Sequence, residues 1–103
     1  MTIKFIRKKV EDNNYFFSKH ADDERKNDNL TILEIEEAIF SGQILENYSE
    51  DRRGKSCLVV GFTNDGKPIH IVCGTNSDTV VIITAYIPTP PKFKNPFERS
   101  YNE

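Results

Sequence analysis

Three β-like runs in the second half of the sequence constrain the fold most. They lie between Ser56 and Tyr86 and are separated by polar turns. An Asp-Gly pair between apolar runs is the strongest short-range signal for a β-hairpin, and Asp65-Gly66 supplies it between the first two runs. The sequence therefore predicts three antiparallel strands, at Cys57 to Phe62, Pro68 to Gly74 and Val80 to Tyr86.

A two-residue turn at Asp65-Gly66 predicts the register of this hairpin, with Gly61 opposite His70 and Leu58 opposite Cys73. Strand side chains alternate between the faces of a sheet, so a slip of one residue would instead bury His70. In the predicted register the apolar core face holds Leu58, Val60, Phe62, Ile69, Ile71 and Cys73. The other face holds Cys57, Val59, Gly61, His70 and Val72.

A small polar cluster is predicted where the third strand joins the hairpin. If Gly74 pairs with Val80, His70 lies opposite Thr84, and Tyr86 follows on the same face. This cluster is the best candidate site in the sequence.

Helical periodicity predicts a helix from Tyr15 to about Lys26, with Phe16, Phe17 and Ala21 in the core. Thr31 and Glu34 read as a capping box that starts the next helix. That helix is expected to end at Gly42 as a left-handed terminator, and its inward residues are Leu33, Ile35, Ala38 and Ile39.

Shorter signals complete the predicted fold. Ile3 to Val10 is expected to form a short helix within an N-terminal segment (residues 1–14), and Ile44 to Ser49 a further strand. Residues 15–93 are expected to form a single α+β domain, followed by a loose tail over residues 94–103. The predicted fold class is thus α+β, with two or three N-terminal helices packed on one face of a four-stranded antiparallel sheet.

Composition narrows the class of protein. The chain has 103 residues and a formal net charge of −2, and this charge does not indicate a nucleic-acid-binding protein. It has neither an apolar run long enough to span a membrane nor a signal-peptide pattern, so a cytoplasmic protein without a membrane partner is expected. In the predicted register Cys57 and Cys73 point to opposite faces, so both should remain free thiols.

Six short motifs, taken together and in order, resemble a known bacterial family, domain of unknown function 4258. They are His20-Ala-x-x-Glu24-Arg25, Ile39-x-x-Gly42, Ile44-x-Glu46-x-Tyr48, Asp51-x-x-Gly54-x-Ser56-Cys57, Gly66-x-Pro68-Ile-His70 and Ile83-Thr84-Ala85-Tyr86-x-Pro88. The family in turn resembles the RelE/ParE and BrnT toxins, which act on RNA or on topoisomerase. The resemblance implies a small α+β toxin-like domain.

The first functional hypothesis is a metal-independent RNase. Such an enzyme needs a general base, a general acid and a cation for the phosphorane charge. His70 is the natural acid or base, assisted by His20, Tyr86 and Thr84. The substrate phosphates are assigned to Arg52, Arg53 and Lys55, and structural support to Glu24 and Arg25.

Structural roles for the same residues stay open. His20 is four residues from Glu24 on a helix and could simply pair with it. His70 could be a partly exposed histidine bonded to Thr84. A metal site of His20, Glu24 and His70 is disfavoured because nothing forces His70 towards the helix, and no cofactor is expected. Cys57 reads as a small hydrophobe rather than a nucleophile.

The second hypothesis is a non-catalytic protein-interaction domain. Here the open sheet face around His70 and Tyr86, with Val59, Val72, Val80 and Ile82, is covered by a partner helix or strand. A neutralising protein could use the same surface. A homodimer could form through either expected edge strand, Ile44 to Ser49 or Val80 to Tyr86.

Overall fold

The computed structural model describes residues 1–48, 55–90 and 92–100. Within this part of the chain, the helices are α1 (Ile3–Glu11), α2 (Lys19–Asn27) and α3 (Ile32–Ser41). The strands there are β1 (Tyr15–Phe17), β2 (Gln43–Tyr48), β3 (Ser56–Phe62), β4 (Pro68–Asn76), β5 (Thr79–Tyr86), β6 (Phe93–Asn95) and β7 (Glu98–Arg99). The predicted α+β class is confirmed, and the expected helix at the N-terminus is present. None of the described helices is long and apolar enough to cross a membrane.

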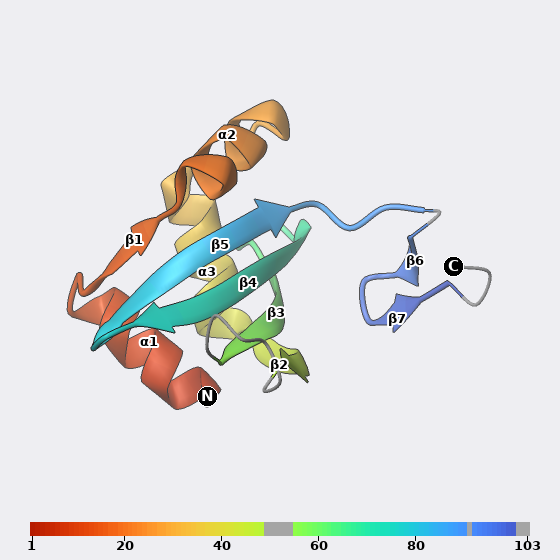
Figure 1. Ribbon diagram of the computed structural model, residues 1–103. Helices are drawn as coiled ribbons and strands as arrows, with labels where there is room; N and C mark the ends of the chain where they lie inside the picture. The colour runs from red at the N-terminus through yellow and green to blue at the C-terminus, as the bar shows by residue number, and fades with distance from the viewer. Residues whose placement is uncertain (49–54, 91, 101–103) are drawn as a thin grey trace.

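The main sheet has one more strand than the four expected. Its order is β1-β5-β4-β3-β2, with β1 parallel to β5 and the other neighbours antiparallel. The helices pack on one side of this sheet, and the β6–β7 hairpin lies on the other side (Figure 1). The hairpin replaces part of the loose tail expected over residues 94–103, of which residues 101–103 lie outside the described residues.

The predicted helix from Tyr15 to Lys26 starts too early. Residues Tyr15–Phe17 form β1, and α2 begins after Ser18, whose side chain accepts a hydrogen bond from the Ala21 backbone. Three consecutive aromatic residues favour a strand, and alternation then turns Phe16 away from the core. Phe16 is accordingly 46% exposed, whereas Ala21 is buried as expected.

Helix α3 confirms the predicted capping box of Thr31 and Glu34. The helix ends before Gly42, but Gly42 has φ −85° and ψ 174° and so is not a left-handed terminator. A glycine is needed there because a Cβ would lie 2.6 Å from the Ala38 carbonyl oxygen. The expected inward position of Leu33 is wrong, since this side chain is 64% exposed.

The β3–β4 hairpin has a longer loop than predicted, and this changes its register. Thr63 and Lys67 are joined by a backbone hydrogen bond of 2.9 Å, so three residues rather than two form the loop, with Gly66 at φ 92°. The strands are therefore displaced by one residue. His70 lies opposite Val60, not Gly61, and Cys73 lies opposite Cys57, not Leu58.

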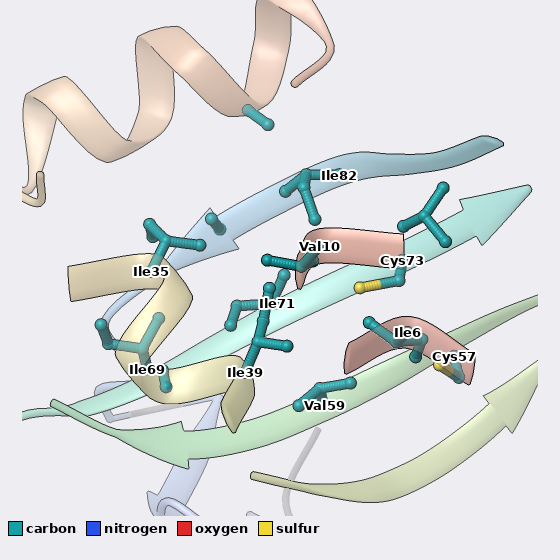
Figure 2. Packing of buried hydrophobic residues seen from close by; sticks show 14 of the residues in the cluster. Ile6, Val10, Ile35, Ile39, Cys57, Val59, Ile69, Ile71, Cys73 and Ile82 are labelled. Carbon is teal, nitrogen blue, oxygen red and sulfur yellow. The ribbon is translucent and has the colours of Figure 1, made fainter. Parts of the chain in front are cut away.

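This displacement exchanges the predicted faces of β3. Figure 2 shows the side that meets the helices, where Ile35 and Ile39 of α3 and Ile6 and Val10 of α1 point towards the strands. The strand residues in this core are Cys57, Val59, Ile69, Ile71, Cys73, Val80, Ile82 and Ala85. Leu58, Val60 and His70 are buried on the opposite side, so the predicted pairing of Leu58 and Val60 with Ile69 and Ile71 on one face is wrong.

Two consequences follow for the earlier predictions. Cys57 and Cys73 are free thiols, as expected. They lie opposite each other on one side of the sheet, however, so the prediction that they point to opposite faces is wrong. Val59, Val80 and Ile82 lie in the core and cannot form the open face proposed for a partner.

The predicted register of β5 is also displaced. Val80 pairs with Thr75 and not with Gly74, and a bulge at Val72/Cys73 adds a second residue of displacement. Thr84 therefore lies opposite Val72, and Tyr86 lies opposite His70. Strand β5 lies between β1 and β4 and is therefore not the edge strand that was expected, whereas β2 is one.

Candidate functional site

His20 is the exposed member of a three-residue cluster that joins α2 to β5. Its Nε2 atom lies 3.1 Å from the Thr84 hydroxyl oxygen and 3.7 Å from Oε1 of Glu24. The Thr84 hydroxyl donates its single proton to Oε1 of Glu24 over 2.5 Å, so it must accept from Nε2–H of His20. Nε2 of His20 therefore carries a proton in this arrangement, which leaves Nδ1 as the ring nitrogen that can accept one, and the His20 side chain is 70% exposed.

The sequence places these residues together by simple local rules. His20 and Glu24 are four residues apart on α2 and so share one side of the helix. Strand β1 pairs with β5 only as far as Ile82, which leaves the later part of β5 without a strand neighbour on that side. A carboxylate of α2 and the carboxylate of its C-cap residue take that place. Glu24 accepts the backbone N–H of Ala85, and Asp28 that of Ile87, each at 2.9 Å.

A groove runs beside this cluster, between the end of α2 and the segment that follows β5. Its volume is about 450 Å³. Tyr86 forms part of its wall, and Lys92 is its one cation among the described residues. The lining residues are Glu24, Asn27, Asp28, Tyr86, Ile87, Thr89 and Lys92. The groove therefore combines two carboxylates, an aromatic ring and an ammonium group next to an exposed imidazole.

His70 lies behind Tyr86 and is fully buried. The Pro96 carbonyl oxygen, 2.6 Å from Nε2, can only accept, so Nε2 carries the proton. Nδ1 then accepts from the Tyr86 hydroxyl at 3.2 Å. The Phe93 ring packs edge-on against the imidazole, with the ring centroids 4.4 Å apart. Burial is the main cause that lowers the pKa of His70, so the imidazole is neutral at pH 7.

Two further residues hold the hairpin over His70. Arg99 of β7 donates two hydrogen bonds, each of 2.9 Å, to the two carboxylate oxygens of Glu46 on β2. The Tyr48 hydroxyl also donates to Glu46. Hydrogen bonding from Arg99 is the main cause that lowers the pKa of Glu46, and burial chiefly raises the pKa of Tyr48 to about 12. Burial also raises the pKa of Tyr86.

Comparison with protein families identifies the matched part of the chain. The family model described as a domain of unknown function (DUF4258) matches residues 17–87. The chain belongs to this family. No curated protein and no solved structure matches it. The DUF4258 segment contains His20, Glu24, Thr84 and Tyr86, whereas Lys92 and the β6–β7 hairpin lie outside it.

The DUF4258 structure divides the predicted catalytic residues between two adjoining places. In the first place, His20 and Thr84 contact each other and Glu24. In the second place, His70 is hydrogen-bonded to Tyr86, and Tyr86 also lines the groove. No hydrogen bond joins Thr84 to His70, because Thr84 lies opposite Val72.

The predicted phosphate-binding residues do not gather at this groove. Lys55 and Thr75 line a separate pocket together with Phe5 of α1. Thr75 is near the end of β4, whereas His70 is near its start, so this pocket is away from the groove. Arg52 and Arg53 lie outside the described residues. Arg25, expected to give structural support, bonds Asp22 and donates to the Leu30 carbonyl oxygen at 3.0 Å.

Other chemistries find little support in this DUF4258 domain. Among residues 1–48, 55–90 and 92–100, no three His, Cys, Asp or Glu side chains converge on a point that could hold a metal. Burial raises the pKa of Cys57 to about 11 and raises that of Cys73 as well. Both thiols therefore stay protonated, which disfavours a nucleophilic role.

Sequence reasoning missed four residues around the site. Asp28 had a signal, because Glu24 and Asp28 are four positions apart and so lie along one side of the helix end. Glu46 stood in the motif Ile44-x-Glu46-x-Tyr48 but was given no role. Lys92 and Arg99 had no signal, because they reach the site only through the path of the chain after β5.

Proposed function

We propose that this DUF4258 domain is a toxin-like protein of the RelE-like group that cleaves RNA without a metal ion, with His20 as the proton-accepting residue. The observation that carries the proposal is the exposed His20 imidazole, fixed by Thr84 and Glu24 beside a groove that contains Tyr86 and Lys92. The wider likeness to RelE-like toxins supports it as a fold analogy from sequence.

The proposed reaction uses the 2′-hydroxyl of RNA as nucleophile. Nδ1 of His20 takes the hydroxyl proton while the 2′ oxygen bonds to phosphorus and the bond to the 5′ oxygen breaks. The Lys92 ammonium compensates the phosphorane charge and gives its proton to the leaving 5′ oxygen. The products are a 2′,3′-cyclic phosphate and a 5′-hydroxyl. Glu24 stabilises the imidazolium that forms on His20, in the manner of an orienting carboxylate beside a catalytic base.

Tyr86 and His70 have supporting roles in this scheme. The Tyr86 ring lines the groove and offers a stacking surface for a base. Its hydroxyl is engaged with His70, whose two ring nitrogens both have partners. Because His70 is buried and held neutral, we assign it to positioning Tyr86 rather than to proton transfer.

Induced expression tests this proposal in cells. Wild-type protein should arrest growth and produce new RNA ends, and His20→Ala should abolish both. Lys19→Ala is the matched control, because Lys19 is the neighbouring residue of α2 and its side chain is 90% exposed. Arrest and new ends that persist in His20→Ala, or folded wild-type protein that leaves growth and RNA intact, would contradict the proposal.

A protein-interaction domain is the second candidate, favoured by exposed apolar residues on the sheet. Phe16 of β1 and Ile83 of β5 are 46% and 39% exposed. Phe16 and Ile83 are not residues of the open face expected from the sequence. Val72 was expected on that face and is partly exposed. An interaction domain would tolerate His20→Ala without loss of its effect, which separates it from the nuclease.

A further inference from the structure

Helix α3 carries an apolar line on the side that faces away from the core. Ile35, Ala38 and Ile39 form its buried side. Leu33 and Phe40 lie about two turns apart on the opposite side, and they are 64% and 44% exposed. Singly exposed apolar residues are ordinary, but two large ones aligned on one helix face form a surface that another helix can cover.

The charges beside this line are acidic. With 100° between successive residues, Glu36 and Glu37 fall on either flank of the line from Leu33 to Phe40. The partners that the structure gives these carboxylates are uncharged. Glu36 accepts from the Tyr15 hydroxyl at 2.5 Å, and Glu37 accepts from the backbone and side-chain nitrogens of Asn64 at 2.9 and 3.0 Å.

Glu34, a neighbouring carboxylate on α3, differs from Glu36 and Glu37 because its partner is a cation. Glu34 is paired with the Lys67 ammonium at 2.6 Å, which leaves little charge there for a partner. The donors that fix Glu36 and Glu37 are neutral, and no ion pair to either carboxylate is seen in the part of the chain that the structure describes. A complementary surface must therefore offer apolar side chains between two flanks of cations.

We propose that the outward face of α3, formed by Leu33, Glu36, Glu37 and Phe40, binds a basic amphipathic helix of a partner protein. A second copy of this chain fits less well, because pairing the same face with itself would bring Glu36 and Glu37 towards the same carboxylates of the other copy. The proposal does not depend on the nuclease, since none of these residues lines the groove at α2 and β5.

A synthetic peptide probe tests this surface. The probe is a fluorescent helix with one leucine face flanked by lysines, and its control has glutamate in place of each lysine. The lysine peptide should bind the wild-type chain, and the glutamate peptide should bind at least ten-fold more weakly. Amide chemical shifts of α3 should move on binding, and the affinity should fall as salt is raised because the contacts are exposed charges.

Matched variants make the result specific. Leu33→Ser and Phe40→Ser should each weaken binding about ten-fold, and the double variant Glu36→Gln with Glu37→Gln should remove most of the salt dependence. Phe97→Ser is the apolar control, since Phe97 is 44% exposed on the hairpin. Glu11→Gln is the charge control on α1.

Three results would overturn the proposal. They are equal loss of affinity in Leu33→Ser and Phe97→Ser, equal binding of the lysine and glutamate peptides, and a homodimer that Leu33→Ser dissociates. The substituted side chains are exposed or accept only neutral donors, so the variants should remain folded, which circular dichroism checks.

Discussion

The His70 imidazole donates a hydrogen bond from Nε2 to the Pro96 carbonyl oxygen, 2.6 Å away, across 26 residues of sequence. This contact ties the β6–β7 hairpin to the side of the sheet opposite the helices. It also explains why a histidine is buried here, because each ring nitrogen has a partner of matching polarity. The histidine that the sequence made the first catalytic candidate is thus buried between Tyr86 and the hairpin.

Replacing His70 should destabilise the fold. His70→Ala leaves the Pro96 carbonyl and the Tyr86 hydroxyl without a partner and opens a cavity, so we expect a loss of about 3 kcal/mol in the free energy of unfolding. Urea denaturation measures this loss. His20→Ala is the control and should cost less than about 0.5 kcal/mol because His20 is largely exposed. Equal losses in the two variants would contradict the structural role of His70.

Stability should depend on pH through the same residue. The folded pKa of His70 lies below the ordinary value of 6.5, chiefly because of burial, so the unfolded chain binds a proton more readily than the folded one. The contribution of His70 is therefore complete above about pH 6.5 and is lost as the pH falls from there towards the folded pKa. Glu46 also has a lowered pKa, but its contribution is lost below 4.5, in a separate window.

Unfolding in urea at several pH values between 5 and 8 checks this dependence. The free energy of unfolding should fall with decreasing pH in the wild type and should change less in His70→Gln, which keeps a polar side chain of similar size. A steeper fall in His70→Gln than in the wild type would refute the assignment.

The ion pair of Glu46 and Arg99 should hold the hairpin with modest strength. The Arg99 side chain is 42% exposed, so a double-mutant cycle with Glu46→Gln and Arg99→Gln should give a coupling of roughly 0.5–1 kcal/mol. Limited proteolysis should cut Arg99→Gln more readily between residues 88 and 100 than the wild type. Identical cleavage of the two proteins would show that the ion pair does not hold the hairpin.

Gly61 should be the glycine least tolerant of substitution. A Cβ at this position would lie 1.8 Å from the Ala38 carbonyl oxygen, so Gly61→Ala must push α3 away from β3. We expect a loss of about 3 kcal/mol, at the upper end of the usual cost of overpacking. Gly66→Ala is the control, since no atom lies within 4 Å of its Cβ and only its φ of 92° opposes the change. A smaller loss in Gly61→Ala than in Gly66→Ala would contradict the packing described.

Local patterns predicted much of this fold. The capping box at Thr31 and Glu34 and the strand positions follow from short-range chemistry, which sequence displays directly. The register does not, because one additional loop residue between Thr63 and Lys67 exchanges the faces of β3. In the next pair of strands Val80 pairs with Thr75, not with Gly74, and the bulge at Val72/Cys73 adds a second residue of displacement, so that the residue opposite His70 is Tyr86 and not Thr84.

The site was harder to predict than the fold. His20, Glu24 and Thr84 were all recognised as candidates, but their contact joins α2 to β5 through a difference of about 60 residues in sequence. The hairpin that buries His70 consists of strands of three and two residues. Strands this short do not show an alternating pattern of apolar and polar residues in the sequence.

The most direct test of the proposed function is cleavage of a defined single-stranded RNA by the purified protein in the presence of EDTA. The proposed reaction should give fragments that end in a 2′,3′-cyclic phosphate, and the single-turnover rate should be at least about 100-fold lower in His20→Gln than in the wild type. Lys19→Ala should retain the wild-type rate. Cleavage by His20→Gln at the wild-type rate, or no cleavage by folded wild-type protein, would contradict a nuclease centred on His20.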